Sequence, residues 1–193
     1  RWHWRARPSK RDRAMPMADL IRALRKNRIV FGVLSIEYIE GPGSRAFLGD
    51  WPVYEAMREA PDVIAGFAFV NMNGGYPGCP NGPPTTPDDL DRFRRLGFLG
   101  LKSIQKWGGK TVDDASLQPV YERAAALRMP VVFHSNPGWD ENCGVGRIAA
   151  MAAANPSLPA VAIAHGVAAE DLDKLYEKLA AIPNLYQQHM HYG

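Results

Sequence analysis

The sequence predicts an α/β protein with a parallel sheet of about six β/α units. Short apolar runs rich in β-branched residues or alanine alternate with amphipathic stretches along the 193-residue chain. The apolar runs recur at intervals of about 25 to 36 residues, which is the size of a βαβ unit. Such units form parallel sheets with right-handed crossovers, so a (β/α) barrel and a doubly wound open sheet both fit the pattern.

Hydrophobic periodicity places the individual elements. The first helix is expected because Leu20, Ile21 and Leu24 fall on one face, and the strand after it is rich in β-branched residues. The expected helices lie at 17–27, 51–60, 88–97, 115–128, 146–155 and 168–182, and the expected strands at 29–36, 63–71, 98–104, 130–134, 158–165 and 184–188.

A Gly/Pro-rich stretch at 74–87 predicts a long loop after the second strand. It is either a substrate loop or a plain surface excursion. Thr86 at its end is followed by Pro87 and by acidic residues, which predicts the start of the next helix, and Gly97 predicts where that helix ends.

The helix at 115–128 is expected to be capped by Asp113 or Asp114. Its apolar residues recur at helical spacing, which predicts one buried face. That face is expected to hold Val120, Ala124 and Leu127.

The segment GVGRIA at 144–149 matches the G-x-G-x-x-A pattern of dinucleotide-binding sites. It lies about ten residues after the strand at 130–134 instead of directly behind it, and no acidic residue ends the strand at 158–165. This context favours glycines at a helix N-terminus, and it argues against the open-sheet alternative.

The composition is that of one soluble globular domain with a basic arm. The chain is 46% hydrophobic and 22% charged, with a net charge of +3. Residues 1–13 carry six basic residues and one acidic residue, a net +5, so the other 180 residues sum to −2. We expect a disordered arm at 1–13 and a barrel domain at 14–193. The body shows no matching basic stripe, so no nucleic-acid partner is expected.

Cysteine usage and hydropathy predict a cytoplasmic protein without a membrane partner. Cys79 and Cys143 lie far apart and outside any CxxC spacing, which excludes a disulfide framework and a zinc knuckle. The chain shows neither a signal-peptide pattern nor an apolar run of about 18 residues.

Two histidines end successive predicted strands, His134 in VVFH and His165 in VAIAH. In a parallel barrel both imidazoles lie at the C-terminal mouth, where catalytic residues gather. Because strand side chains alternate, we expect His134 and Val132 to point into the barrel, and Val131 and Phe133 to face the helices.

Imidazoles at this mouth suit metal and proton chemistry. His134 can bind Zn²⁺, and His165 can be a second ligand or a general acid/base. Lys102, two units before His165, can supply a cation or, if carboxylated, a bridging ligand. A single strand-end histidine is more often a structural hydrogen-bonder, but two on adjacent strands together with Lys102 favour a site.

Other residues are expected at the mouth by position alone. Each is a candidate substrate contact, with loop hydrogen bonding or aromatic packing as the alternative. They are Glu37, Asn71, Asn136 and Trp107, together with His189 and His191, which form a His-x-His after the last strand.

The succession GFLGLKSI, PVYERAAALRMPVVFHSN, NPSLPAVAIAHG and IPNLYQQ resembles the amidohydrolase-related family of metal-dependent TIM-barrel enzymes. The resemblance covers roughly residues 16–188 and is most specific over 97–166. The family includes hydrolases and non-oxidative decarboxylases similar to aminocarboxymuconate-semialdehyde decarboxylase.

This resemblance implies a divalent metal cofactor, with Zn²⁺ first and Mn²⁺ or Fe²⁺ as alternatives. It implies that His134 ends barrel strand five as a metal ligand. It implies that His165 ends strand six as a second ligand or as the catalytic acid/base. A small-molecule substrate and a homodimer are further expectations.

By the same resemblance, the six expected strands correspond to barrel strands two to seven. The His-x-His pair of strand one and the aspartate of strand eight are then not expected here, because WHW at 2–4 holds one histidine and the sequence ends at Gly193. His189 and His191 are expected to contact substrate, with a relocated metal pair as the alternative.

The sequence thus predicts a metal-dependent amidohydrolase-type enzyme, or a fragment of one with an incomplete metal site. The expected reaction is hydrolysis or non-oxidative decarboxylation of a small carboxylated or cyclic substrate. The alternative is a barrel-derived protein that has lost its metal and binds a ligand or a partner.

Overall fold

Six parallel strands form one sheet in the order in which they occur along the chain, β1-β2-β3-β4-β5-β6. The computed structural model describes residues 17–29, 32–34, 51–72, 84–104, 110–135, 140–159, 161–164 and 172–188. The strands are β1 (Gly32–Leu34), β2 (Ile64–Val70), β3 (Gly100–Ser103), β4 (Val131–His134), β5 (Val161–Ala164) and β6 (Leu185–Gln188).

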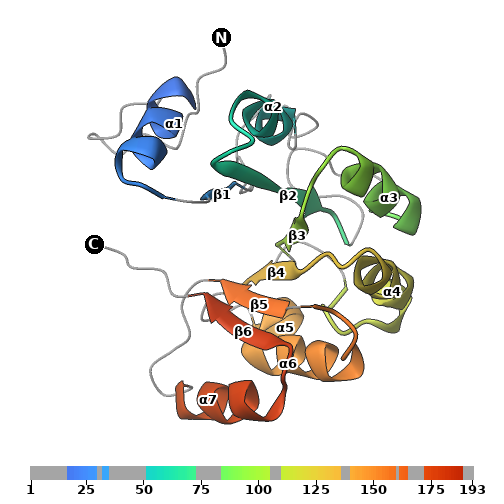
Figure 1. Ribbon diagram of the computed structural model, residues 1–193. Helices are drawn as coiled ribbons and strands as arrows, with labels where there is room; N and C mark the ends of the chain where they lie inside the picture. Colours follow the sequence, from blue (N-terminus) through green and yellow to red (C-terminus); the bar gives the residue numbers. More distant parts are fainter. Residues whose placement is uncertain are drawn as a thin grey trace, which may run out of the picture.

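Helices connect these strands. They are α1 (Met17–Lys26), α2 (Trp51–Glu59), α3 (Pro87–Arg95), the 3₁₀ turn η3 (Ala115–Leu117), α4 (Gln118–Ala126), α5 (Asp140–Cys143), α6 (Val145–Ala154) and α7 (Leu172–Ala181). The strands follow an arc, and α2, α3, α4, α6 and α7 lie outside it (Figure 1).

The strand order decides between the two architectures that the sequence allows. A doubly wound sheet reverses its strand order at a switch point, and ligands bind there. The described sheet has no reversal, and each strand pairs in parallel with the next strand in the chain. This progressive order, with helices on the outside, is that of a (β/α) barrel.

The helix-facing side of the sheet is the main core. Leu101, Val131 and Phe133 are each 0% exposed and pack with residues of α4 and α6. The ring of Phe133 meets the ring of Tyr121 edge to face, with centroids 6.4 Å apart. Alternate strand residues face the inner side of the arc, where Phe69 of β2 and Val132 of β4 are only partly buried.

Local signals place the helix ends as the sequence predicts. Thr86 caps α3: its side chain accepts a hydrogen bond from the Asp89 amide, and the Asp89 side chain accepts one from the Thr86 amide. This capping box satisfies two backbone donors at the first turn. Gly97 follows the helix with a φ of 93°, the left-handed conformation that favours glycine.

The structure refines three details of the expected elements. Asp114, one of the two residues expected as the cap, caps the helix at 115–128, and the first turn of this helix is the 3₁₀ turn η3. Leu127 is only partly buried, whereas Val120 and Ala124 are buried as expected. The short helix α5 was not expected from the sequence.

The glycine segment GVGRIA begins a helix, as its context favours. Gly144 is the N-cap of α6 and has an extended backbone. The arm at 1–13 and the boundary of the 14–193 domain lie outside the described residues, so this division stays a prediction. Among the described helices, none has the length and apolar character needed to cross a membrane.

Candidate active site

His134 is the last residue of β4 and lies at the C-terminal end of the sheet. Its neighbours Val131 and Phe133 belong to the helix-facing core, and Val132 does not. The predicted alternation is therefore confirmed for this strand: His134 shares the inner face with Val132. The His134 side chain is 8% exposed, so its imidazole is largely shielded from solvent.

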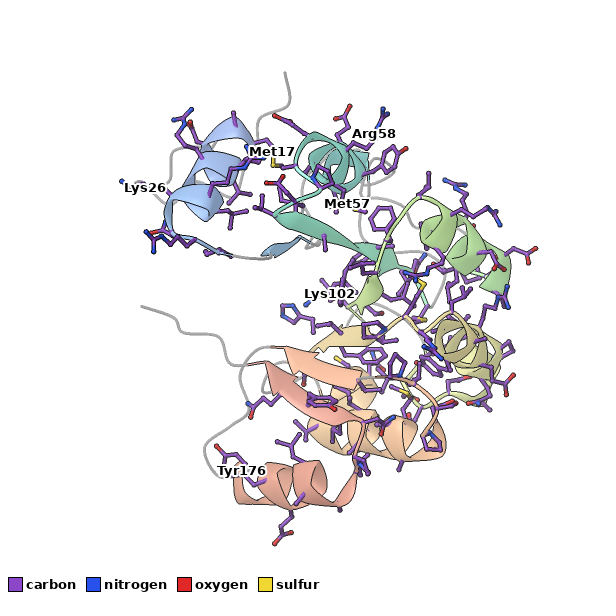
Figure 2. The ribbon with its side chains drawn as sticks, in the orientation of Figure 1. Met17, Lys26, Met57, Arg58, Lys102 and Tyr176 are labelled. Atoms are coloured by element: carbon purple, nitrogen blue, oxygen red, sulfur yellow. The ribbon has the colours of Figure 1, made fainter. Side chains whose placement is uncertain are left out.

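Lys102 lies on the same inner face, one strand away. In the register of β3 and β4, Lys102 is the partner of Val132. His134 lies two residues beyond Val132 and is therefore the diagonal neighbour of Lys102 on this face. Lys102 is 4% exposed. Figure 2 shows it on the inner side of the arc, whereas Met57 lies between α2 and the sheet.

The inner face around Lys102 is apolar on its β2 side. Phe69 is the register partner of Lys102, and Phe67 is that of Gly100. A Cβ atom added at Gly100 would lie 2.6 Å from the Phe67 ring, so this ring lies directly over the glycine. The described inner face thus combines aromatic rings, one ammonium group and one imidazole.

Asn71 follows β2 and holds the base of the long loop through its backbone. Its amide donates to Oγ1 of Thr85 at 2.9 Å, and its carbonyl accepts from the Thr85 amide at 2.7 Å. These two bonds join the chain just before the Gly/Pro-rich stretch to a residue near the end of that stretch. Substrate contact by the Asn71 side chain stays a prediction.

The other predicted site residues lie outside the described part of the chain. Ala164, the last residue of β5, is the register partner of His134, so His165 comes one position later in the sequence. The residues concerned are His165, Glu37, Trp107, Asn136, His189 and His191.

The described residues of the candidate site could supply part of a divalent metal site. The His134 imidazole at the strand end is the donor type that Zn²⁺ prefers. Within the described ranges, no group of three His, Cys, Asp or Glu side chains could hold a metal ion. A catalytic zinc site typically has three protein ligands, so His134 would need partners such as His165 from the rest of the chain.

Sequence reasoning missed a set of contacts around Val112 and Asp113. The hydroxyl of Tyr121 in α4 donates to the carbonyl of Val112 at 2.6 Å, and the Val112 amide donates to the carbonyl of Asn142 at 2.9 Å. Nη1 of Arg147 in α6 lies 3.0 and 3.2 Å from the two carboxylate oxygens of Asp113. These contacts join the segment after β3 to the segment after β4. Only the position of Asp113 just before a helix was a sequence signal.

The pKa of the Asp113 carboxyl reflects this setting. Partial burial raises this pKa, but hydrogen bonds from Thr111 and Arg147, together with the charge of Arg147, lower the pKa by more than burial raises it. The net shift is downward, so Asp113 is a carboxylate at neutral pH and holds the Arg147 guanidinium by charge-assisted hydrogen bonds.

A family model described as amidohydrolase matches residues 1–192 of the chain. The chain belongs to the amidohydrolase family. A comparison with curated proteins found no match. Family membership agrees with the resemblance already visible around His134 and His165.

Solved structures show the same fold at low sequence identity. An uncharacterized TIM-barrel protein from Bordetella bronchiseptica has a TM-score of 0.64 and 16% identity, with 89% of this chain and 58% of that chain covered. A probable 2-pyrone-4,6-dicarboxylic acid hydrolase from Acinetobacter baumannii, with citric acid bound, has a TM-score of 0.63 and 16% identity, with 94% and 62% covered. The structure of an amidohydrolase II has a TM-score of 0.59 and 14% identity, with 91% of this chain and 68% of that chain covered.

These likenesses establish the fold as the TIM-barrel type. The chain spans 58% and 62% of the length of the first two structures. The described sheet has six strands, whereas a complete TIM barrel has eight.

Proposed function

We propose that this chain is the metal-binding part of an amidohydrolase-type enzyme that hydrolyses or non-oxidatively decarboxylates a small carboxylated or cyclic substrate. In this proposal His134 is a metal ligand, and His165 is a second ligand or the general acid/base. Lys102 supplies a positive charge to the substrate. Zn²⁺ is the expected metal, with Mn²⁺ or Fe²⁺ as alternatives.

One observation carries the proposal: a shielded imidazole and a shielded ammonium group share the inner face at the C-terminal end of a parallel sheet. His134 is 8% exposed and Lys102 is 4% exposed, and both belong to strands whose other face is the hydrophobic core. Burying such groups is costly unless polar interactions compensate. Charged and metal-binding groups held at this end of a barrel are typical of a catalytic site.

The chemistry follows from these positions. A divalent metal held at His134 would supply Lewis-acid polarisation to a carbonyl or carboxylate group of the substrate. The ammonium group of Lys102 would attract and orient an anionic substrate group on the β3 side of His134. The rings of Phe67 and Phe69 would contact the apolar part of the substrate and exclude water, which strengthens both charge interactions.

The test is metal content and affinity in the full chain. Purified protein loaded with Zn²⁺ should retain about one metal ion per chain, and His134→Ala and His134→Gln should lose most of it, because a catalytic site depends on each of its few protein ligands. His3→Ala, which removes a histidine from the basic arm, is the matched control and should retain the metal. The glutamine variant keeps most of the side-chain volume, which limits the disturbance of packing around position 134.

Two outcomes would contradict the proposal. Equal, stoichiometric metal in the wild type and both His134 variants would remove the ligand role of His134. A wild-type protein that binds no divalent metal would favour the alternative of a barrel-derived ligand- or partner-binding protein.

A further inference from the structure

The segments that follow β3 and β4 are fastened to each other at the C-terminal end of the sheet. The strand before the first segment carries Lys102, and the strand before the second ends at His134. The Val112 amide donates to the Asn142 carbonyl at 2.9 Å, which joins the two segments through their backbones. Val112 is 0% exposed, so this junction is shielded from water.

A partly exposed ion pair joins the same two segments. Arg147, in the first turn of α6, directs Nη1 at both carboxylate oxygens of Asp113, at 3.0 and 3.2 Å. The two side chains are 42% and 28% exposed. The geometry therefore fixes the start of α6 to the residue next to Val112.

Tyr121 connects this junction to the strand that carries His134. Its hydroxyl donates to the Val112 carbonyl at 2.6 Å, and its ring packs edge to face on the ring of Phe133. Phe133 directly precedes His134 in β4. Tyr121 therefore links Val112 to the residue that precedes His134.

We propose that Val112, Asp113, Tyr121, Asn142 and Arg147 form a latch between the two mouth segments that positions His134, with the Asp113–Arg147 pair as its adjustable part. This inference rests on the proposed function for its metal readout. Asp113 and Arg147 are positioning residues: they act on the substrate or metal only through the segments they hold.

The chain offers a closely matched control pair. Asp91 of α3 and Arg123 of α4 also form a two-pronged ion pair, with side-chain exposures of 25% and 40%. This pair joins the outer helices α3 and α4. Within the described ranges, its hydrogen bonds do not reach Val112 or Asn142. Asp91→Asn therefore removes a comparable ion pair at a similar exposure, between two residues that are not part of the latch.

The experiment compares Zn²⁺ affinity of the full chain, measured by competition with a chelating dye, in Asp113→Asn and Asp91→Asn. We expect Asp113→Asn to weaken Zn²⁺ binding about 3- to 10-fold, and Asp91→Asn to change it less than about 2-fold. Both variants should lose similar thermal stability. Arg147→Gln should match Asp113→Asn, and the double variant should be no weaker than either single one, because both remove one interaction.

Equal effects of Asp113→Asn and Asp91→Asn on Zn²⁺ affinity, or no effect of Asp113→Asn, would overturn the latch. If the wild type binds no Zn²⁺ through His134, the proposed function fails, and the latch is then read from the ¹H–¹³Cε1 resonance of His134, assigned by its loss in His134→Gln. That resonance should shift in Asp113→Asn and stay in place in Asp91→Asn. If it stays in place in both, the latch is refuted independently of the metal.

Discussion

Tyr121→Phe should destabilise the protein through one hydroxyl group. The substitution keeps the ring, so the edge-to-face contact with Phe133 remains. It removes the donor of a 2.6 Å hydrogen bond and leaves the carbonyl of Val112, a residue that is 0% exposed, without that donor. A buried acceptor that loses its partner costs about 1–3 kcal/mol. We therefore expect the free energy of unfolding to fall by this amount.

Urea denaturation measures this loss, with the m-value unchanged because the folded and unfolded surfaces stay the same. For a chain of this size each kcal/mol lowers Tm by about 2–4 °C, so Tm should fall by about 2–12 °C. Tyr176→Phe is the matched control, since Tyr176 is 53% exposed, and its effect should stay within about 0.5 kcal/mol. If both variants lose the same small amount of stability, the buried hydrogen bond of Tyr121 does not stabilise the fold.

The same hydroxyl gives a pH signature. Burial raises the pKa of Tyr121 well above its usual value, because the phenolate would lose its hydration. A raised pKa stabilises the folded state below the unfolded value of about 10, and this contribution is lost as the pH rises above it. The wild type and the matched control Tyr176→Phe should therefore lose more stability above pH 10 than Tyr121→Phe does. Equal alkaline losses in all three proteins would contradict the burial of this phenol.

Two further predictions concern the outer layer. Gly66→Ala should lower the free energy of unfolding by about 1–3 kcal/mol through overpacking, because its new Cβ would lie 2.2 Å from Sδ of Met57. Gly146→Ala is the control and should cause no loss, because its Cβ would meet no atom within 4 Å. Equal urea midpoints for the two variants would contradict this packing. The Arg123 hydrogen bond lowers the pKa of Asp91, so this ion pair stabilises the fold above the unfolded value of about 4 and its contribution is lost as the pH falls through the lowered folded pKa. The Tm difference between wild type and Asp91→Asn should therefore shrink between pH 7 and strongly acidic pH, and a constant difference would exclude the ion pair as its cause.

The sequence predicts well what short-range chemistry determines. The cap of α3 depends on Thr86 and Asp89, three residues apart, and the left-handed turn after it depends on Gly97 alone. The alternation in β4 depends on neighbouring residues of one strand. In each case the physical cause lies within one turn or one strand, so the residue order contains it.

Long-range pairing is not predictable in the same way. Asp113 and Arg147 are 34 positions apart, and nothing in the local sequence around either residue selects one charged partner over another. The sequence placed Asp113 only as a possible helix cap, a role that Asp114 takes because its carboxylate accepts from the Ser116 amide at 2.8 Å. The strand order also depends on contacts between units, so both the barrel and the open sheet remained consistent with the pattern of apolar runs.

The register of β4 links the hydrophobic core to the candidate site. Phe133 and His134 are adjacent, so they face opposite sides of the sheet. A slip of one residue would move the phenylalanine ring to the inner face and bury the imidazole against Tyr121. Val131 and Phe133, both 0% exposed, oppose that slip because their burial against the helices would be lost. The depth and direction of His134 are therefore set by its apolar neighbours, and a substitution that loosens Phe133 should impair the site before it unfolds the protein.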